Sequence, residues 1–577
     1  MYFKFLSLHK PFLFLFLLPV YSVGVCQVFP EKHYPQGYFI YPVKAKIALV
    51  ANFGELRPNH FHMGLDCRTD QTENHVVFAA ADGYIAHVKI EPLGFGRAIY
   101  IAHPNGLSTL YAHLNDFYPA LEKYIKEQQY KLKSWKLNID IPPGLFQVQK
   151  GDLIAYSGTT GGSQGPHVHF EIRDTKTDKV LNPLLFGFPL PDNVPPVISR
   201  LALYDRTLST YEQVPKLFPV RALHGEFALQ PADLIVTSEK ISFAISASDK
   251  RNGSASANGI FQSILYMDDM PVNAFELDSI SYDETRDENA HIDYKLKESG
   301  GPFVEHLSRL PGYPSGVYKD IAGNGVIMLP DENTHRMKVE VKDAAGNRSI
   351  LRFNLRRKLL TTPVLKNTDM YNIFHPGFIN IFEKNDIVVI VGEKALYDSF
   401  PLQYVKQPSI NLESVSEQHL VEGGSVPLRI PFTIKLKVSK FVALEELPLI
   451  IMQREWKGKR EVIKPQIEGD WFVAHFKEFG NFQLLLDKVP PLISVNFTDQ
   501  ANLAQASKII VNITDNNKSI KNFVGELNGN WLRFSNDKGR SFIYKFDEMC
   551  RQGKNELRIH VEDEAGNTTE KVFHFTR

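Results

Sequence analysis

Short apolar runs separated by glycine-rich turns dominate the chain between residues 41 and 189. In runs such as KIALVANF, GRAIYIAH and HVHFEIR, apolar residues tend to alternate with small or polar ones. Alternation with a period of two is typical of half-buried β-strands, and turns at short intervals favour antiparallel pairing. The pattern predicts a compact antiparallel β-domain over residues 27–190.

One segment of this region has helical spacing. Asp116 is a candidate N-cap, Pro119 suits a first helical turn, and Leu121 and Ile125 follow four residues apart. The sequence predicts a short helix within an insertion over residues 116–143. Two interpretations of the insertion stay open: a wall or lid over a substrate groove, or simple packing against the side of the domain.

An internal repeat begins after residue 190. VPPVIS at 194–199 recurs as VPPLIS at 489–494, and KDAAGN at 342–347 recurs as EDEAGN at 562–567. Alternating apolar residues before each Gly-Asn pair predict a β-hairpin in which Gly and Asn supply positive φ angles. These segments resemble bacterial immunoglobulin-like modules.

The repeat divides the rest of the chain. We expect an immunoglobulin-like module with insertions over 191–360 and a second one over 489–577. Strand-like runs such as IVVIVG and FTIKLKV predict a further β-sandwich over 361–488. The predicted fold class is therefore mainly all-β, an antiparallel first domain followed by several β-sandwich modules.

The first 26 residues have the layout of a secretory signal peptide, because Lys4 and Lys10 precede an apolar run from Pro11 to Val20, which small and polar residues follow. No later stretch approaches the ~20 apolar residues of a membrane helix, so we expect no transmembrane helix in the mature chain. Cleavage before Gln27 is the preferred interpretation, and lipidation of Cys26 is the alternative. Both predict an exported protein of the periplasm or cell envelope, anchored or secreted.

The composition of the chain bears on which classes of partner to expect. The chain has 577 residues with 65 basic and 65 acidic side chains, so its net charge gives no electrostatic reason to expect a nucleic-acid partner. Cys67 and Cys550 are far apart in the sequence and make no disulfide framework, so Cys67 is expected to pack as a small apolar residue. A wall polymer or a protein remains open as a partner of the C-terminal modules.

Metal-ligating residue types concentrate in three fragments. In HVHFEIR, alternation places His167, His169 and Glu171 on one strand face, with the two histidines about 6.6 Å apart. In HMGLD, a straight strand would separate His62 from Asp66 by about 13 Å, too far to share one ion. A bend between them is therefore required for joint coordination, and Gly64 suits such a bend.

The combined pattern is more specific than any fragment. Four motifs follow one another along about a quarter of the chain: His-x-Gly-x-Asp, Tyr-Ala-His-Leu, Ser-Gly-x-Thr-Gly and Gly-Pro-His-x-His-Phe-Glu. In this order they resemble the lysostaphin-type zinc metallopeptidases. The resemblance implies one Zn²⁺ with His62, Asp66 and His169 as ligands, and His113 and His167 as the catalytic pair. Three protein ligands that leave a fourth position open are typical of catalytic zinc.

The resemblance implies an endopeptidase that hydrolyses peptide bonds of bacterial peptidoglycan, in stem peptides or cross-links, with metal-activated water. Two alternatives stay open: a catalytically silent wall-binding or hydrolase-activating protein, and a secreted protease for other proteins. His60 and His103 are interpreted as structural, whereas Glu171 either orients a ligand or has a plain surface or salt-bridge role. The C-terminal modules either bind a partner or space the catalytic domain.

Overall fold

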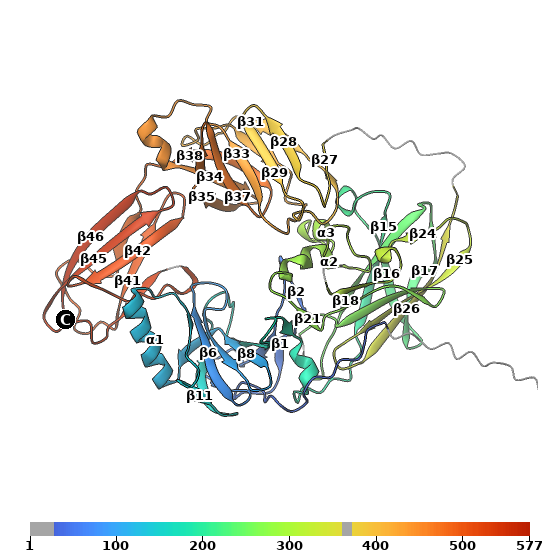
Figure 1. Cartoon of the computed structure of the whole chain (residues 1–577), viewed down its shortest axis with the longest axis horizontal. Coiled ribbons are helices and arrows are strands. Elements are labelled where there is room, and N and C mark those ends of the chain that lie inside the picture. The colour runs from blue at the N-terminus through green and yellow to red at the C-terminus, as the bar shows by residue number, and fades with distance from the viewer. Residues whose placement is uncertain (1–27, 255, 315, 360–371, 540) are drawn as a thin grey trace, which may run out of the picture.

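The computed structural model describes residues 28–254, 256–314, 316–359, 372–539 and 541–577. The predicted signal peptide, with Cys26, lies outside these ranges. Strands dominate all four domains, which confirms the mainly all-β fold class (Figure 1). Figure 1 shows the domains arranged in a ring, with the C-terminal domain beside the first one. In the part of the chain that the structure describes, no helix is both long and apolar enough to cross a membrane.

The first domain is built on an antiparallel sheet in the order β1-β4-β13-β8-β7-β6-β10, with β11 beside β6 and β14 beside β13. Its strands are β1 (Leu49–Ala51), β4 (Leu65–Arg68), β6 (Gly83–Ile90), β7 (Arg97–Ala102), β8 (Leu107–Ala112), β10 (Leu137–Asp140), β11 (Gln147–Val148), β13 (His167–Asp174) and β14 (Val180–Leu181). A smaller sheet shares the same apolar core and contains β5 (Val76–Phe78), β12 (Leu153–Ser157) and β9 (Leu114–Phe117). A hairpin of β2 (Leu56–Arg57) and β3 (His60–Phe61) and a short 3₁₀ helix, η1 (Pro183–Phe186), complete the domain. Cys67 is fully buried in the core, as predicted.

The predicted helix is present as α1 (Pro119–Leu132), which buries Leu121 and Ile125. Its expected cap is wrong, because Asp116 belongs to strand β9. Tyr118 is the N-cap residue and makes no side-chain cap hydrogen bond, while Pro119 occupies the first turn as predicted. The helix therefore starts on a proline with favourable φ and is stabilised by packing rather than by a polar cap.

The second domain has one long sheet in the order β22-β18-β15-β16-β17-β26-β25-β19-β20-β23, with β24 beside β18. Its strands are β15 (Val197–Asp205), β16 (Lys216–Leu223), β17 (Glu226–Val236), β18 (Lys240–Ser248), β19 (Gln262–Met267), β20 (Met270–Glu276), β22 (Glu305–His306), β23 (Tyr318–Asp320), β24 (Ile327–Met328), β25 (Thr334–Lys342) and β26 (Arg348–Arg357). Its helical segments are η2 (Thr210–Glu212), η3 (Thr285–Asp287), α2 (Glu288–His291), α3 (Tyr294–Glu298) and η4 (Gly323–Gly325). The first half of β16 pairs with β15 and its second half with β17, so the sheet passes from one layer to the other within this strand.

The first and second domains are joined by a shared sheet and a shared apolar core as well as by a linker. Strand β21 (Ser279–Ile280) of the second domain pairs with β14 and so extends the sheet of the first domain. Apolar side chains of the first domain lie in the core of the second; they are Phe53, Phe61, Met63 and Val180. The side-chain amide of Asn52 donates to the carbonyl of Gly259 at 2.9 Å and accepts from its N–H at 3.1 Å. The two domains form one packed unit.

The third domain is a sandwich of two five-stranded sheets around a common apolar core. One sheet contains β28 (Asn380–Lys384), β29 (Ile387–Val391), β33 (Phe432–Leu436), β37 (Trp471–Phe476) and β36 (Gln466–Glu468). The other contains β31 (Tyr404–Gln407), β32 (Gln418–Val421), β38 (Gly480–Leu486), β34 (Ile450–Trp456) and β35 (Lys459–Ile463). A separate pair, β27 (Ile373–Phe374) and β30 (Phe400–Pro401), and η5 (Leu444–Leu449) flank the sandwich.

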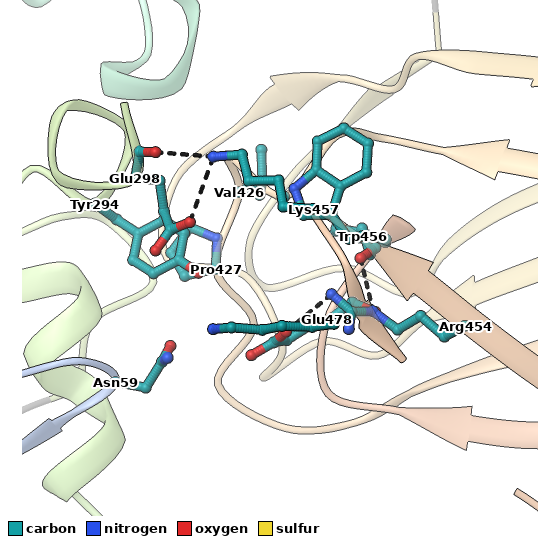
Figure 2. A pocket seen from close by; sticks show the side chains of 12 residues that line it. Asn59, Tyr294, Glu298, Val426, Pro427, Arg454, Trp456, Lys457 and Glu478 are labelled. Carbon is teal, nitrogen blue, oxygen red and sulfur yellow. Dashed lines mark hydrogen bonds and ion pairs between the residues drawn. The ribbon is translucent and has the colours of Figure 1, made fainter. Parts of the chain in front are cut away.

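A pocket lies where the second domain meets the third (Figure 2). The ammonium group of Lys457 donates to the carbonyl of Glu298 at 2.8 Å, and Arg454 pairs with Glu478 at 2.8 Å. None of the five histidines and acids predicted as site residues lines this pocket. It is therefore an interdomain feature, separate from the predicted chemistry.

The fourth domain has a three-stranded and a five-stranded sheet around its own core. Its strands are β39 (Leu492–Val495), β40 (Ala501–Asn502), β41 (Lys508–Thr514), β42 (Ile520–Leu527), β43 (Asn530–Trp531), β44 (Phe542–Lys545), β45 (Lys554–Asp563) and β46 (Thr568–Thr576), with η6 (Asp537–Gly539) between β43 and β44. It closes the ring against α1, where Lys126 forms ion pairs with Asp547 and Glu548 at 2.9 Å each. The predicted insertion thus contacts the C-terminal domain (Figure 1).

Both predicted hairpins occur, as β25-β26 and β45-β46. Their turns differ from expectation at one residue. Gly346 and Gly566 have positive φ angles of 92° and 101°, but neither Asn347 nor Asn567 does. Each Asn instead uses its side-chain amide to bind an aspartate carboxylate four residues earlier, at 2.7 and 2.9 Å. These Asn residues hold carboxylates in place instead of shaping the turn.

Candidate metal centre

The register of three neighbouring strands brings the predicted site residues together. On β13, His167 and His169 alternate with buried apolar residues, as the sequence predicted. His169 lies opposite Asp66 of β4 on one side and opposite Ala112, the last residue of β8, on the other. His113 follows β8 directly, so antiparallel pairing alone gathers residues that are up to about a hundred positions apart.

The three residues predicted as metal ligands converge on one point. His62 Nε2 lies 2.9 Å from Asp66 Oδ1 and 3.0 Å from His169 Nδ1, and His169 Nδ1 lies 3.0 Å from Asp66 Oδ1. All three side chains are buried, with residue exposures of 6–7%. The group is a buried triangle of two imidazole nitrogens and one carboxylate oxygen that could hold a metal ion.

Gly64 is required here for a different reason from the one predicted. The chain does bend between His62 and Asp66, but Gly64 has no positive φ angle. A Cβ atom at this position would lie 2.4 Å from the carbonyl oxygen of Phe170 on β13. The residue therefore allows the His62 segment to approach β13 closely enough for its imidazole to reach His169.

The second ring nitrogen of each predicted histidine ligand also has a hydrogen-bond partner. His62 Nδ1 lies 2.6 Å from the carbonyl of Asn52, and His169 Nε2 lies 2.9 Å from Glu171 Oε1. When each ring is neutral, donation of its one N–H to these acceptors leaves His62 Nε2 and His169 Nδ1 with free lone pairs, which both point into the triangle. The hydrogen-bond partners thus select the tautomers that a metal needs.

His113 and His167 flank the triangle. His167 Nε2 lies 3.4 Å from Asp66 Oδ1, and the His113 and His167 rings are 4.8 Å apart. The Nδ1 atom of each ring lies 2.8 Å from a carbonyl of the glycine-rich turn, that of Thr160 for His113 and that of Gly165 for His167. This glycine-rich turn, residues 157–165, therefore orients both imidazoles.

The backbone of His113 is strained. Its φ angle is 61°, in the left-handed region that non-glycine residues rarely adopt. Its N–H donates to the carbonyl of Phe95 at 3.0 Å. Strain of this kind persists only where the surrounding structure enforces it, and it concentrates at functional sites. The fold directs this side chain toward the other histidines.

Glu171 is an internal link and not a surface residue. Its side chain is completely buried and accepts hydrogen bonds from His169, Arg173 and Tyr282. Tyr282 belongs to the second domain and comes 111 residues after Glu171. Nothing in the sequence around Tyr282 signals its contact with Glu171, so sequence analysis missed this residue. The second domain thus reaches the candidate site through the Tyr282 hydroxyl.

The titrating groups form an environment suited to a cation. Burial alone would raise the pKa of Asp66, but His62, His167 and His169 hold it well below its usual range. Burial alone would lower the pKa of His169, but hydrogen bonds to Asp66 and Glu171 raise it to about 9. Burial and the neighbouring His167 and His169 lower the pKa of His113 to about 3. At neutral pH, Asp66 is therefore ionised, His113 is neutral, and His169 carries a second proton that a bound metal ion would displace.

The C-terminal domain touches the glycine-rich turn. The N–H of Gly161 donates to Asp537 Oδ1 at 2.8 Å, and Lys538 Nζ donates to the carbonyl of Ser163 at 2.8 Å. The two histidines interpreted as structural remain outside the triangle: His60 contacts the carbonyl of Pro58, and His103 contacts Thr109 among others. The turn that orients His113 and His167 is thus braced from the far end of the chain.

Comparisons with known proteins match two parts of the chain. Residues 60–130 and 144–183 match the peptidase family M23 model, and the gap falls within the predicted insertion. Residues 372–487 match the Zu5-like domain model.

Curated relatives match over about a quarter of this chain. The DD-carboxypeptidase/endopeptidase Mpg of Neisseria meningitidis serogroup B is 30% identical over 158 residues, 27% of either chain. The cell division protein DipM of Caulobacter vibrioides is 28% identical over 144 residues, 25% of this chain and 19% of DipM. The chain thus matches at most about a quarter of the length of these curated relatives.

Among solved structures, the catalytic domain of lysostaphin from Staphylococcus simulans is 21% identical and covers 23% of this chain and 87% of its own length, with a TM-score of 0.17. The residues matched by the family model lie in the domain that carries the histidine cluster. The first domain of this chain is therefore a lysostaphin-type domain of peptidase family M23.

Proposed function

We propose that the chain is a zinc-dependent endopeptidase of the bacterial cell envelope that hydrolyses peptide bonds of peptidoglycan. One observation carries the proposal: His62, Asp66 and His169 present three ligand atoms about 3 Å from one another, with His113 and His167 beside them. The M23 match of this domain supports peptidase chemistry. A peptidoglycan substrate and an envelope location follow from the family resemblance.

The ligand set fits catalytic zinc. Two neutral imidazoles and one carboxylate are a donor set that Zn²⁺ prefers, and three protein ligands leave a position open. Ligand atoms that each lie about 2.0 to 2.2 Å from one ion are separated by little more than 3 Å, close to the observed spacing. Zinc held there supplies Lewis-acid activation of water and of the peptide carbonyl.

The protein's own groups have distinct tasks. With Nδ1 donating to a backbone carbonyl, each of His113 and His167 has its Nε2 available for the reacting groups. A neutral ring accepts the proton of the attacking water at Nε2, and a ring that carries protons on both nitrogens donates from Nε2 to the oxyanion of the tetrahedral intermediate. Asn52 and Glu171 hold His62 and His169 in the required tautomers.

Digestion of purified peptidoglycan sacculi by the zinc-loaded full chain, alongside a panel of folded and denatured proteins, tests the proposal. We expect soluble muropeptides with new amino termini and little proteolysis of the panel. Cleavage of the panel alone would favour a secreted protease. Binding to sacculi without cleavage would favour a silent wall-binding or hydrolase-activating protein.

Replacing His113 or His167 by Ala should separate chemistry from metal binding. Neither residue belongs to the triangle of ligand atoms, so bound zinc should stay near one equivalent per chain. Turnover should fall by roughly 10²- to 10⁴-fold, the usual contribution of a general acid or base. Metal content by mass spectrometry and release of muropeptides measure the two effects. A His167→Ala chain without zinc would show that the two histidines of the HVH motif have been assigned the wrong way round.

Tyr282 is expected to act as a positioning residue. Tyr282→Phe removes the hydroxyl that donates to Glu171, which in turn orients His169. Loss of such an outer contact should weaken zinc affinity by about 10-fold or more. Competition with a chromogenic chelator measures the affinity, and Tyr266→Phe, in β19 of the second domain, is the matched control. Equal zinc affinities of the two variants would exclude this role.

A further inference from the structure

Two clusters of three aspartates lie outside the histidine site, each at the start of a domain. Asp192, Asp249 and Asp343 form the first cluster, and Asp487, Asp515 and Asp563 form the second. In each cluster, one oxygen from every carboxylate lies within 4.8 Å of the others. We propose that each cluster is a Ca²⁺ site that ties an interdomain linker to the domain that follows it.

The first cluster is buried. Asp249 and Asp343 are each 2% exposed, and the side chain of Asp192 is fully buried. Asp249 comes directly after β18 and Asp343 directly after β25, whereas Asp192 lies in the linker ahead of β15. Three carboxylates removed from water at this spacing repel one another unless positive charge compensates them.

Two oxygens of this cluster lack the partners that buried oxygens normally have. Asp249 Oδ1 and Asp192 Oδ2 are both inaccessible to solvent and accept no hydrogen bond. Arg251 is the nearby cation, with Nη2 at 3.6 Å from Asp192 Oδ2, and its Nη1 donates to the carbonyl of Leu190 at 3.1 Å. A single guanidinium cannot balance three carboxylates, so the cluster is left with excess negative charge and free acceptor atoms.

In each cluster, the pKa of one aspartate is raised above its ordinary value, as expected for crowded carboxylates. Burial, followed by the carboxylates of Asp343 and Asp192, raises the pKa of Asp249 to about 7. In the second cluster, burial raises the pKa of Asp515, and the carboxylates of Asp487 and Asp563 add to this effect. Both aspartates lie where a cation would relieve the cost of their ionisation.

The second cluster repeats the first. Asp515 follows β41, Asp563 ends β45, and Asp487 precedes β39 in the linker from the third domain. Asp515 Oδ1 is buried without a hydrogen-bond partner, like Asp249 Oδ1. Asp487 here accepts hydrogen bonds from the amides of Asn516 and Asn517, at 3.0 and 2.7 Å. The nearby Lys464 directs its ammonium group to the carbonyl of Ala565.

The repeated Asn residue shows that the two clusters are equivalent. Asn347 Nδ2 donates to Asp343 Oδ2 at 2.7 Å and to the carbonyl of Asp192 at 3.2 Å. Asn567 Nδ2 makes the same pair of contacts, to Asp563 Oδ2 at 2.9 Å and to the carbonyl of Asp487 at 3.0 Å. Two domains with different strand orders thus keep one arrangement of acids around the linker.

The ligand chemistry selects the ion. The clusters offer carboxylate oxygens without imidazole or thiolate, and hard oxygen ligands suit Ca²⁺ better than zinc or copper. Ca²⁺ accepts irregular coordination, whereas Mg²⁺ requires near-ideal octahedral geometry and keeps several waters, for which a buried cluster has little space. Sites in extracellular modules typically bind Ca²⁺ with dissociation constants of about 10⁻⁴ to 10⁻³ M.

Equilibrium dialysis of the zinc-loaded full chain against radioactive Ca²⁺ tests the proposal. We expect two equivalents bound to the wild type, one to Asp249→Asn, one to Asp515→Asn and none to the double variant. Asp470→Asn, which removes an exposed carboxylate from the third domain, should still bind two. Mg²⁺ at equal concentration should displace little Ca²⁺. Absence of bound Ca²⁺ at about 10 mM, ten-fold above the weakest typical site, would overturn the proposal.

Thermal unfolding separates a cation site from a purely structural cluster. Without Ca²⁺, the double variant should be at least as stable as the wild type, because each substitution removes a buried, poorly compensated charge. Added Ca²⁺ should raise the unfolding temperature of the wild type and of Asp470→Asn, but not that of the double variant. A double variant that is equally destabilised with and without Ca²⁺ would show that the carboxylates serve packing alone.

Discussion

Asp66→Ala is expected to lose bound metal and peptidase activity together. Asp66 Oδ1 lies within 3.0 Å of both imidazole nitrogens of the triangle, and it supplies the only negative charge among the three ligand atoms. Without it, two neutral imidazoles remain, and activity should fall below detection because no metal is held. Metal content by mass spectrometry and muropeptide release measure the outcome.

The matched control is Asp140→Ala. Asp140 lies on β10 of the same sheet with a 95% exposed side chain, so it should keep metal, activity and fold. Circular dichroism of both variants separates loss of metal from loss of fold. An Asp66→Ala chain that retains one tightly bound zinc would contradict the proposed ligand set.

A chain that ends after Leu190 is expected not to fold stably, although every predicted chemical residue precedes this point. The truncation removes strand β21 from the sheet and exposes four apolar side chains whose core lies in the second domain. At roughly 1.5–3 kcal/mol for each buried side chain, the loss is on the order of 6–12 kcal/mol. This is comparable with the whole stability of a typical domain. Soluble yield, thermal unfolding and zinc content measure the effect.

A chain that ends after Lys488 is the control. It keeps the first three domains and loses only the fourth, with its contacts to α1 and to the glycine-rich turn. It should remain folded and hold zinc. A stable, zinc-loaded domain over residues 28–190 would show that the interface is dispensable and that the first domain is an independent module.

Local pattern was sufficient for much of the fold. Period-two alternation predicted the β13 strand and placed His167, His169 and Glu171 on one face, because side-chain direction along a strand depends only on neighbouring residues. Helical spacing predicted α1 for the same reason. The predicted cap at Asp116 was wrong because this residue lies within β9, whose pairing with β12, a tertiary contact, outweighed the local preference of Asp116 for a helix start.

The sequence predicted which residues form the candidate site better than it predicted their geometry. The motifs containing His62, Asp66, His113, His167 and His169 were recognisable together, and the structure brings these five side chains into one place. The reason for Gly64 was not predictable, since it concerns the distance to Phe170 on another strand. Their assigned roles as ligands and as catalytic pair remain proposals that the substitutions above test.

The sequence by itself determined the strand-rich fold, the repeat and the set of residues available for metal chemistry, because these depend on periodicity and on motifs within a few positions. Only the tertiary structure decided that Tyr282 reaches Glu171, that the fourth domain braces the glycine-rich turn, and that aspartates from separate strands meet at each linker. These contacts join residues tens to hundreds of positions apart. Their formation depends on how whole domains pack, and no local pattern of apolar and polar residues encodes that packing.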